Sequence, residues 1–161
     1  MDVKLPSNAR LPGIDESVAR DQIVEVCRRM HGRGLISGGE GNVSIRLGPS
    51  RILVTPSGTN KGFLNPADLL VMDPSGNPVK GRGKPSSESR MHLAAYRVRP
   101  DCGAVVHAHT PTAVAFTIAG LSLAQCVVPE SVLAFGEIRT APYATPTTRE
   151  LADEQIGRAH V

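Results

Sequence analysis

The sequence predicts a mixed α/β sandwich, in which β-hairpins form a sheet and helices are interleaved between them. Two pairs of short strand-like segments are joined by turns: residues 42–47 with 51–55, and residues 69–73 with 78–80. Apolar residues recur at helical spacing before the first hairpin and after the second, and hairpins combined with such helices favour a mixed sandwich over a strict βαβ series. At 161 residues, with no internal repeat and no linker, the chain is expected to form one domain with a sizeable core.

The first helix is expected to follow a polar, proline-containing arm at residues 1–13. Asp15 can cap this helix, which apolar residues carry to about Met30. The glycines of the segment 31–34 then end it. The apolar stripe expected to face the core comprises Val18, Ile23, Val26, Cys27 and Met30. Asn65-Pro66 predicts a second, short helix, because proline suits the first helical position.

Two longer helices are expected on either side of an apolar strand. Ser86 or Ser87 is expected to cap a helix that runs to about Val98. Thr110-Pro111 is expected to start another, which Gly120 closes. Further predictions are a strand at residues 138–141 and a helix opening at Thr147. The inward face of the helix to Val98 is expected to comprise Met91, Ala94, Ala95 and Val98.

Composition and charge exclude several classes of partner. The net charge of +3 comes from scattered basic residues, and only 3% of residues are aromatic. A nucleic-acid-binding protein would need a stacking platform or a helix-turn-helix signature, and we find neither. No apolar stretch approaches the roughly 20 residues of a membrane span, and the N-terminus lacks the apolar core of a signal peptide. The expected partner is a small anionic substrate, with no nucleic acid and no membrane.

The three cysteines are Cys27, Cys102 and Cys126. They are odd in number, widely spaced and without a CxxC pair, so a disulfide framework is not expected. This usage favours a reducing, cytoplasmic location, with all three thiols as small core residues.

The most informative motif is His107-Ala108-His109, which ends the apolar run at residues 102–106. This run is short, small and β-branched, and therefore predicts a buried strand. On a strand, side chains two residues apart leave the same face, about 7 Å from each other. Two neutral imidazoles on one face suit a divalent metal such as zinc. The alternative is a pair of histidines that pack at the end of a strand.

Three loops each place Gly, Ser or Asn at a junction between predicted elements. They are Ser37–Asn42, Thr55–Thr59 and Pro85–Glu88. Backbone N–H groups and hydroxyls converging from such loops can bind a phosphate dianion. Each loop alone would be an ordinary turn, and only their combination favours a phosphate site.

Glu88 lies at the beginning of the predicted helix that ends near Val98. It is either a carboxylate that caps its own helix or a proton carrier and metal ligand beside the two histidines. His92 follows one turn later and is interpreted as a packing residue behind the site rather than a ligand.

Six ordered motifs, spread over residues 23–151, resemble the class II aldolase/adducin family, and within it the fuculose-phosphate aldolases. They are Gly41-Asn-Val-Ser44, Thr55-Pro-Ser-Gly58, Lys84-Pro-Ser-Ser-Glu88, His92-Leu-Ala-Ala-Tyr96, His107-Ala-His109 and Ala141-Pro-Tyr-Ala-Thr145. The resemblance implies a three-layer αβα sandwich on a mixed, largely antiparallel sheet. It also implies a homotetramer with active sites between subunits.

The resemblance also assigns roles to individual residues. His107 and His109 match zinc ligands, and Glu88 matches the residue that alternates between zinc ligand and general acid/base. The residues that match phosphate-binding positions are Gly41, Asn42, Ser57, Gly58, Ser86 and Ser87.

The implied reaction is zinc-dependent aldol cleavage or condensation of a sugar phosphate. A fuculose-1-phosphate-like ketose phosphate would give dihydroxyacetone phosphate and an aldehyde through a metal-bound enediolate, which a Lewis acid stabilises. This route needs no Schiff-base lysine, so Lys61 and Lys84 are interpreted as loop charges. The alternatives are 4-epimerisation of a pentulose phosphate, dehydration or decarboxylation on the same scaffold, and a non-catalytic, adducin-like scaffold.

The chain departs from the family pattern at two places. The fuculose-phosphate aldolases place a proton-donating tyrosine between the two-histidine strand and the Ala-Pro-Tyr-Ala-Thr motif, and residues 124–136 contain none. The third zinc histidine of the family lies in a His-Gly motif later than Val161, and His160 precedes valine.

We therefore expect residues 1–155 to be an incomplete N-terminal domain of this family, lacking its C-terminal portion. The ending Ile156–Val161 can be encoded by the opening of a widely used short-read sequencing adapter, so residues 156–161 are interpreted as a non-native tail. The chain as it stands is expected to be inactive.

Overall fold

A computed structural model describes residues 13–123, 129–136, 138 and 140 of the chain. Its centre is a five-stranded sheet with the order β4-β3-β2-β1-β5. All four pairings between these strands are antiparallel, and both predicted hairpins are confirmed. The strands are β1 (Asn42–Gly48), β2 (Arg51–Val54), β3 (Leu70–Met72), β4 (Pro78–Lys80) and β5 (Ala104–His107).

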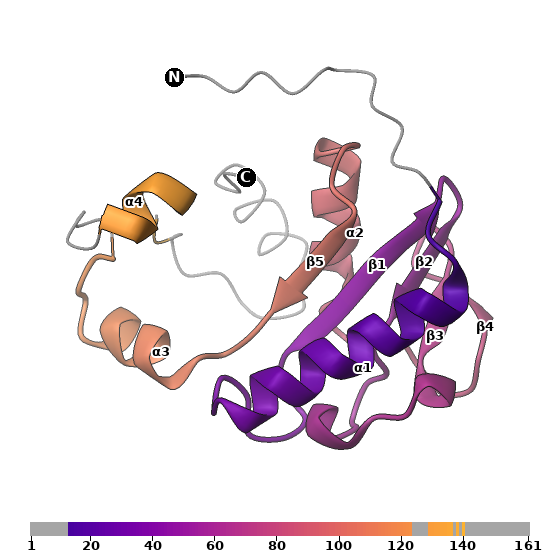
Figure 1. The fold of residues 1–161 in the computed structure, drawn as a ribbon, viewed down its shortest axis with the longest axis horizontal. Coiled ribbons are helices and arrows are strands. Elements are labelled where there is room, and N and C mark those ends of the chain that lie inside the picture. The colour runs from indigo at the N-terminus through magenta and orange to yellow at the C-terminus, as the bar shows by residue number, and fades with distance from the viewer. Residues whose placement is uncertain (1–12, 124–128, 137, 139, 141–161) are drawn as a thin grey trace.

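Helix α1 (Glu16–Gly32) covers one face of the sheet (Figure 1). The predicted cap is confirmed, because the Asp15 carboxylate accepts hydrogen bonds from the backbone N–H groups of Ser17 and Val18. The predicted stripe is only partly correct, since Val18 is about half exposed and Ala19 is buried in its place. The buried residues of α1 are Ala19, Ile23, Cys27 and Met30, and they pack on Val43, Leu53 and Val71 of the sheet.

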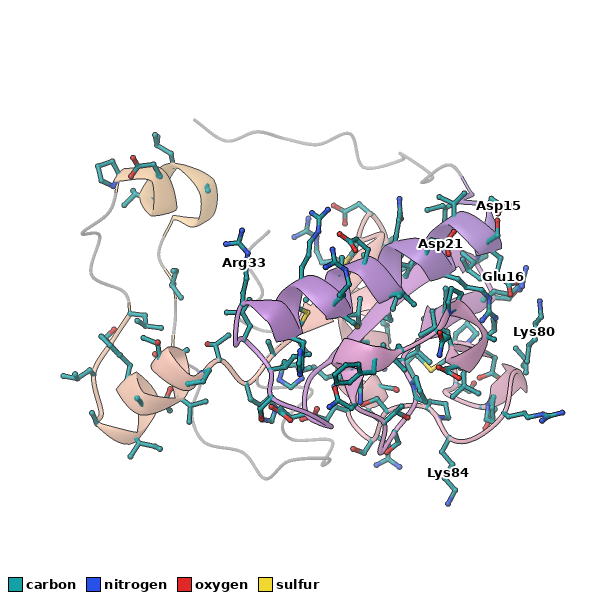
Figure 2. All side chains as sticks on the ribbon, turned by 60° about the horizontal axis from the view of Figure 1, so that its bottom comes forward. Asp15, Glu16, Asp21, Arg33, Lys80 and Lys84 are labelled. Carbon is teal, nitrogen blue, oxygen red and sulfur yellow. The ribbon has the colours of Figure 1, made fainter. Side chains whose placement is uncertain are left out.

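The N-terminal turn of α1 is tied to the far edge of the sheet by Glu16 (Figure 2). Its carboxylate pairs with Arg20, Arg51 and, at 2.9 Å, with Lys80 of β4. The hydrogen bond from Lys80 is the largest cause that lowers the pKa of Glu16 to about 2. The ion pairs of Glu16 therefore act together with the hydrophobic contact to hold α1 against the sheet.

Helix α2 (Ser89–Val98) lies against the opposite face, so the predicted αβα layering is confirmed (Figure 1). The strand residues that face it alternate with those that face α1, as the period of a strand requires. Buried Tyr96 of α2 packs in a cluster with Ile52, Val54, Leu70 and Met72.

Two predictions for α2 are wrong. The helix begins at Ser89 rather than directly after Ser86 or Ser87, and Glu88 occupies the N-cap position. Its buried residues are Ser89, His92, Ala94 and Tyr96, whereas Val98 is about half exposed and Met91 and Ala95 are only partly buried. The face that α2 turns toward the sheet differs from the predicted one because His92 and Tyr96 both make hydrogen-bonding contacts with the buried Ser44.

Short helices occupy several connections. The short helix predicted at Asn65-Pro66 is the 3-10 helix η2 (Pro66–Asp68), preceded by η1 (Lys61–Phe63). Helix α3 (Pro111–Ile118) is as predicted, and α4 (Pro129–Phe135) was not predicted. Both lie to one side of the sheet (Figure 1). Ile138 and Thr140 are not in a strand, and the predicted helix at Thr147 lies outside the described residues.

The cysteine predictions are confirmed in part. Cys27 is fully buried on the core-facing side of α1, and Cys102 is partly buried. Cys126 lies outside the described residues. Within the described ranges, no helix has the length and apolar character needed to cross a membrane.

Replacement of Leu53 by alanine is expected to destabilise the protein by about 2–5 kcal/mol, since this fully buried side chain lies in the central strand β2. Urea denaturation followed by circular dichroism measures the change in the free energy of unfolding. Val79→Ala, at an exposed position of β4, is the control and should cost less than about 0.5 kcal/mol. Equal effects of the two substitutions would contradict the described core.

Candidate functional site

Glu88, His107 and His109 form a cluster at the end of β5. One ligand atom from each residue lies within 4.8 Å of the other two. Glu88 Oε2 is 3.3 Å from His107 Nδ1, and Glu88 Oε1 is 3.5 Å from His109 Nε2. The two imidazole centroids are 4.7 Å apart. Strand β5 ends at His107, so His109 reaches the cluster from the segment that follows.

The pairing of β1 with β5 positions this cluster. Asn42, the first residue of β1, lies directly opposite His107 in the antiparallel register. Its Nδ2 donates to Glu88 Oε2 at 2.7 Å and lies 3.3 Å from His107 Nδ1. Asn42 therefore links the strand, the histidine and the carboxylate, and the phosphate-binding role that the resemblance implies for it stays a prediction.

Gly41 allows the two strands to approach each other at this point. Its φ is +73°, a conformation that favours glycine. A Cβ atom here would lie 2.9 Å from both the His107 carbonyl oxygen and Ile36 Cγ2. Any side chain at position 41 would push β1 away from His107.

Glu88 is half-buried at the N-cap of α2, and its charged form is stabilised by its neighbours. The hydrogen bond with His107 is the largest cause that lowers the pKa of Glu88 to about 2. The charge of His109 and the hydrogen bond from Asn42 also lower this pKa, while burial opposes them. Glu88 is thus a carboxylate near neutral pH, as a metal ligand requires.

Two of the three predicted phosphate loops are joined by backbone hydrogen bonds. The Ser57 N–H donates to the Lys84 carbonyl at 2.9 Å, and the Ser86 N–H donates to the Thr55 carbonyl at 3.1 Å. These two amides are therefore already used. Among the described residues, the N–H groups of Gly58 and Ser87 have no hydrogen-bond partner, and nor do the hydroxyls of Ser57 and Ser87.

The loop Ser37–Asn42 already contains an anion of its own. The Glu40 carboxylate accepts from the N–H and hydroxyl of Ser37 and from the Gly38 N–H. The Ser37 hydrogen bonds are the largest causes that lower the pKa of Glu40 to about 2. Ser37 and Gly38 are thus occupied internally, and only Gly41 and Asn42 of this loop reach the cluster.

The two lysines interpreted as loop charges differ from each other. Lys84 is exposed and points away from the protein, as expected (Figure 2). Lys61 is only 2% exposed, so this charge is buried rather than solvated. Its Nζ is held between backbone carbonyls of two of the three loops.

His92 belongs to a buried polar chain behind the cluster, in agreement with its interpretation as a packing residue. Its Nδ1 is 2.7 Å from Ser44 Oγ, which lies 2.8 Å from the Tyr96 hydroxyl. Nε2 of His92 is buried and has no partner among the described residues. Burial is the main cause that lowers the pKa of His92 to about 3.

The model of the class II aldolase and adducin N-terminal domain matches residues 21–160. The chain belongs to the class II aldolase and adducin family. This match covers the sheet, α2, most of α1 and the whole Glu88–His107–His109 cluster.

Relatives of this chain are named for different activities. A 3-oxo-tetronate 4-phosphate decarboxylase from Haemophilus influenzae is 35% identical over 144 residues, covering 87% of this chain and 68% of that protein. An L-fuculose phosphate aldolase from Methanocaldococcus jannaschii is 32% identical over 139 residues, covering 86% and 75%. The solved structure of an L-fuculose 1-phosphate aldolase superposes with a TM-score of 0.79 at 31% identity, covering 89% and 68%.

Substitution of His92 by asparagine should flatten the pH dependence of stability. The pKa of His92 is lowered to about 3 in the folded state. Below about pH 6.5 the unfolded chain therefore binds a proton on this imidazole, whereas the folded protein does not. The stability contributed by neutral His92 is present above that pH and is lost as the pH falls toward 3.

Urea unfolding at pH 7 and pH 5 provides the measurement. Between these values the wild-type protein should lose about 2 kcal/mol more than His92→Asn. Asparagine can place an amide near the position of Nδ1, which keeps the contact with Ser44. Parallel losses in the two proteins would show that His92 is protonated in the fold.

Proposed function

We propose that Glu88, His107 and His109 bind a zinc ion and that the site acts on a phosphorylated ketose. The observation that carries the proposal is the convergence of two imidazoles and one carboxylate within 4.8 Å. This mixture of nitrogen and oxygen donors suits zinc, and catalytic zinc sites commonly use three protein ligands. When bound, such an ion would act as a Lewis acid that stabilises negative charge developing on a carbonyl oxygen.

The residues of the chain would share the remaining tasks. Glu88 would remove the proton next to the ketone, since it lies between the histidines and is ionised near neutral pH. Asn42 would hold the Glu88 carboxylate in position through its 2.7 Å hydrogen bond. Gly58 and Ser87 would donate their free N–H groups to the phosphate, with the hydroxyls of nearby serines.

Of the residues predicted to bind phosphate, Ser57, Gly58, Ser86 and Ser87 lie on two loops that the backbone holds together. Gly41 and Asn42 remain proposed phosphate-binding residues, and they would also fix the strand that carries the metal side of the site. Phosphate at one end and carbonyl at the other would orient the substrate for proton transfer.

The leading reaction in this proposal is aldol cleavage and condensation of a fuculose-1-phosphate-like ketose phosphate. The decarboxylase and aldolase names among the relatives share one chemical requirement, because both reactions create negative charge on a carbon next to a ketone. Decarboxylation is therefore the second candidate, followed by dehydration and 4-epimerisation. A non-catalytic, adducin-like role is less well supported, since the cluster retains all three side chains.

We further propose a domain boundary, a homotetrameric assembly and a cytoplasmic location for this protein. Residues 1–155 are proposed as the family's N-terminal domain and residues 156–161 as a non-native tail. A homotetramer would cover apolar side chains such as Ile118 and Leu133, which are 81% and 89% exposed. A cytoplasmic location fits a phosphorylated sugar substrate.

Zinc titration against a chromophoric chelator tests the metal site. Two imidazoles and one carboxylate should bind zinc in the micromolar range or more weakly, and His109→Ala or Glu88→Gln should weaken binding by about tenfold or more. His31→Ala is the control, because this histidine packs on Phe63 away from the cluster. Equal affinity in all four proteins would contradict the assignment of these ligands. Nanomolar affinity in the wild-type chain would contradict the expectation that a site with only two imidazoles binds zinc weakly.

Exchange of a dihydroxyacetone phosphate proton for deuterium, followed by NMR with excess zinc, tests the reaction. The chain is expected to be inactive in aldol cleavage, so the test follows only the first proton transfer. The wild-type chain should exchange this proton when zinc is in excess, and Glu88→Gln should be slower by about a hundredfold or more. Complete aldol cleavage by this chain is not expected, because residues 124–136 contain no tyrosine to donate a proton to the aldehyde oxygen. Exchange at the same rate in both proteins would reject Glu88 as the proton carrier.

A further inference from the structure

Lys61 is the buried ionisable group that the proposed mechanism does not use. It opens η1 and has 2% exposure, which makes it the largest side chain among those fully buried in the described part of the chain. A buried ammonium is unfavourable unless an opposite charge or several hydrogen bonds compensate it. Within the described ranges, no carboxylate forms an ion pair with Lys61.

The hydrogen bonds of Lys61 join two of the loops predicted to bind phosphate. Its Nζ donates to the Gly39 carbonyl at 2.9 Å and to the Thr59 carbonyl at 2.7 Å. Its backbone N–H donates to the Gly38 carbonyl at 3.0 Å. An ammonium has three N–H groups, so two carbonyls leave one of them without a described partner.

The backbone around Lys61 is fixed by the end of α1. A Cβ atom on the neighbouring Gly62 would lie 2.4 Å from Cγ of His31, so helix and turn are in direct contact. The His31 ring also packs edge-on against Phe63. Lys61 therefore lies on a turn that packs directly against the end of α1, and its ammonium links both loops to that helix.

We propose that Lys61 is a positioning residue that supplies the fixed positive charge beneath the phosphate loops. Its ammonium holds the Gly39 and Thr59 carbonyls, and its charge is compensated when a phosphomonoester dianion binds to the loops above it. Burial lowers the pKa of Lys61, while the charges of Cys27, Glu40 and Glu88 oppose this shift and favour the ammonium form. The inference rests on the proposed phosphate site and adds a residue to it.

Titration with inorganic phosphate and with glycerol phosphate, monitored by the backbone amide signals of the full chain, tests this role. Lys61→Gln keeps N–H donors for the two carbonyls but removes the charge, whereas Lys61→Arg keeps the charge. We expect Lys61→Gln to bind both probes about tenfold more weakly than wild type, and Lys61→Arg to stay within about threefold.

Lys80→Met is the matched control, because it removes one exposed lysine charge that pairs with Glu16 at the far edge of the sheet (Figure 2). It should bind phosphate as the wild type does. Wild-type affinity in Lys61→Gln would overturn the inference and leave the phosphate site intact. Absence of phosphate binding in the wild-type chain would reject the phosphate site itself, and the inference with it.

A measurement on the unmodified protein covers the case in which the variants do not fold. Saturation with phosphate should raise the pKa of the Lys61 amine, followed through the NMR signal of its Cε, because the bound dianion favours the ammonium. An unchanged pKa with phosphate bound would overturn the proposal. So would trapping of dihydroxyacetone phosphate on Lys61 by borohydride, since that shows a nucleophilic amine.

Discussion

The antiparallel register between β1 and β5 is the constraint on which the rest of the site depends. It places Asn42 opposite His107, and from there Asn42 reaches Glu88 on a third element. Gly41 makes the register possible, since any Cβ at that position would meet the His107 carbonyl. A shift of one residue would turn the side chains of β5 to the opposite face and separate the histidines from the carboxylate.

Buried polar groups fix the surroundings of this pairing. Ser44 of β1 lies between His92 and Tyr96 of α2, so the helix that begins at Glu88 is held to the strand that begins at Asn42. On the other side, Lys61 links the loops that follow α1 and β2. Such buried contacts are costly when incomplete, which favours one arrangement of the loops over many. The result is a site whose position is determined by the core.

The sequence predicted most of the fold because local signals and the hydrophobic pattern agree. The cap at Asp15, the hairpin turn after Gly48 and the Asn65-Pro66 turn each have a local chemical cause. The inward face of α2 was missed because its buried side chains include His92, which is buried through a tertiary hydrogen bond. No spacing rule contains that information.

The candidate site was predictable to a similar extent. His107, His109 and Glu88 were recognised from their types and order, and the structure brings them together. The role of Asn42 depends on strand register, and the burial of Lys61 depends on three segments that converge in space. Glu40 appeared to be one more loop residue, although its carboxylate occupies the amides of its own loop. These features arise from long-range contacts, which a single sequence does not encode locally.

The central claim is that two histidines and Glu88 form one metal site. X-ray absorption spectroscopy of the zinc-loaded chain tests it most directly, because the spectrum reports the atoms bound to the metal. We expect only nitrogen and oxygen neighbours at about 2.0–2.2 Å, with the outer-shell scattering of two imidazoles. Sulfur neighbours near about 2.3 Å, or a spectrum without imidazole scattering, would contradict it.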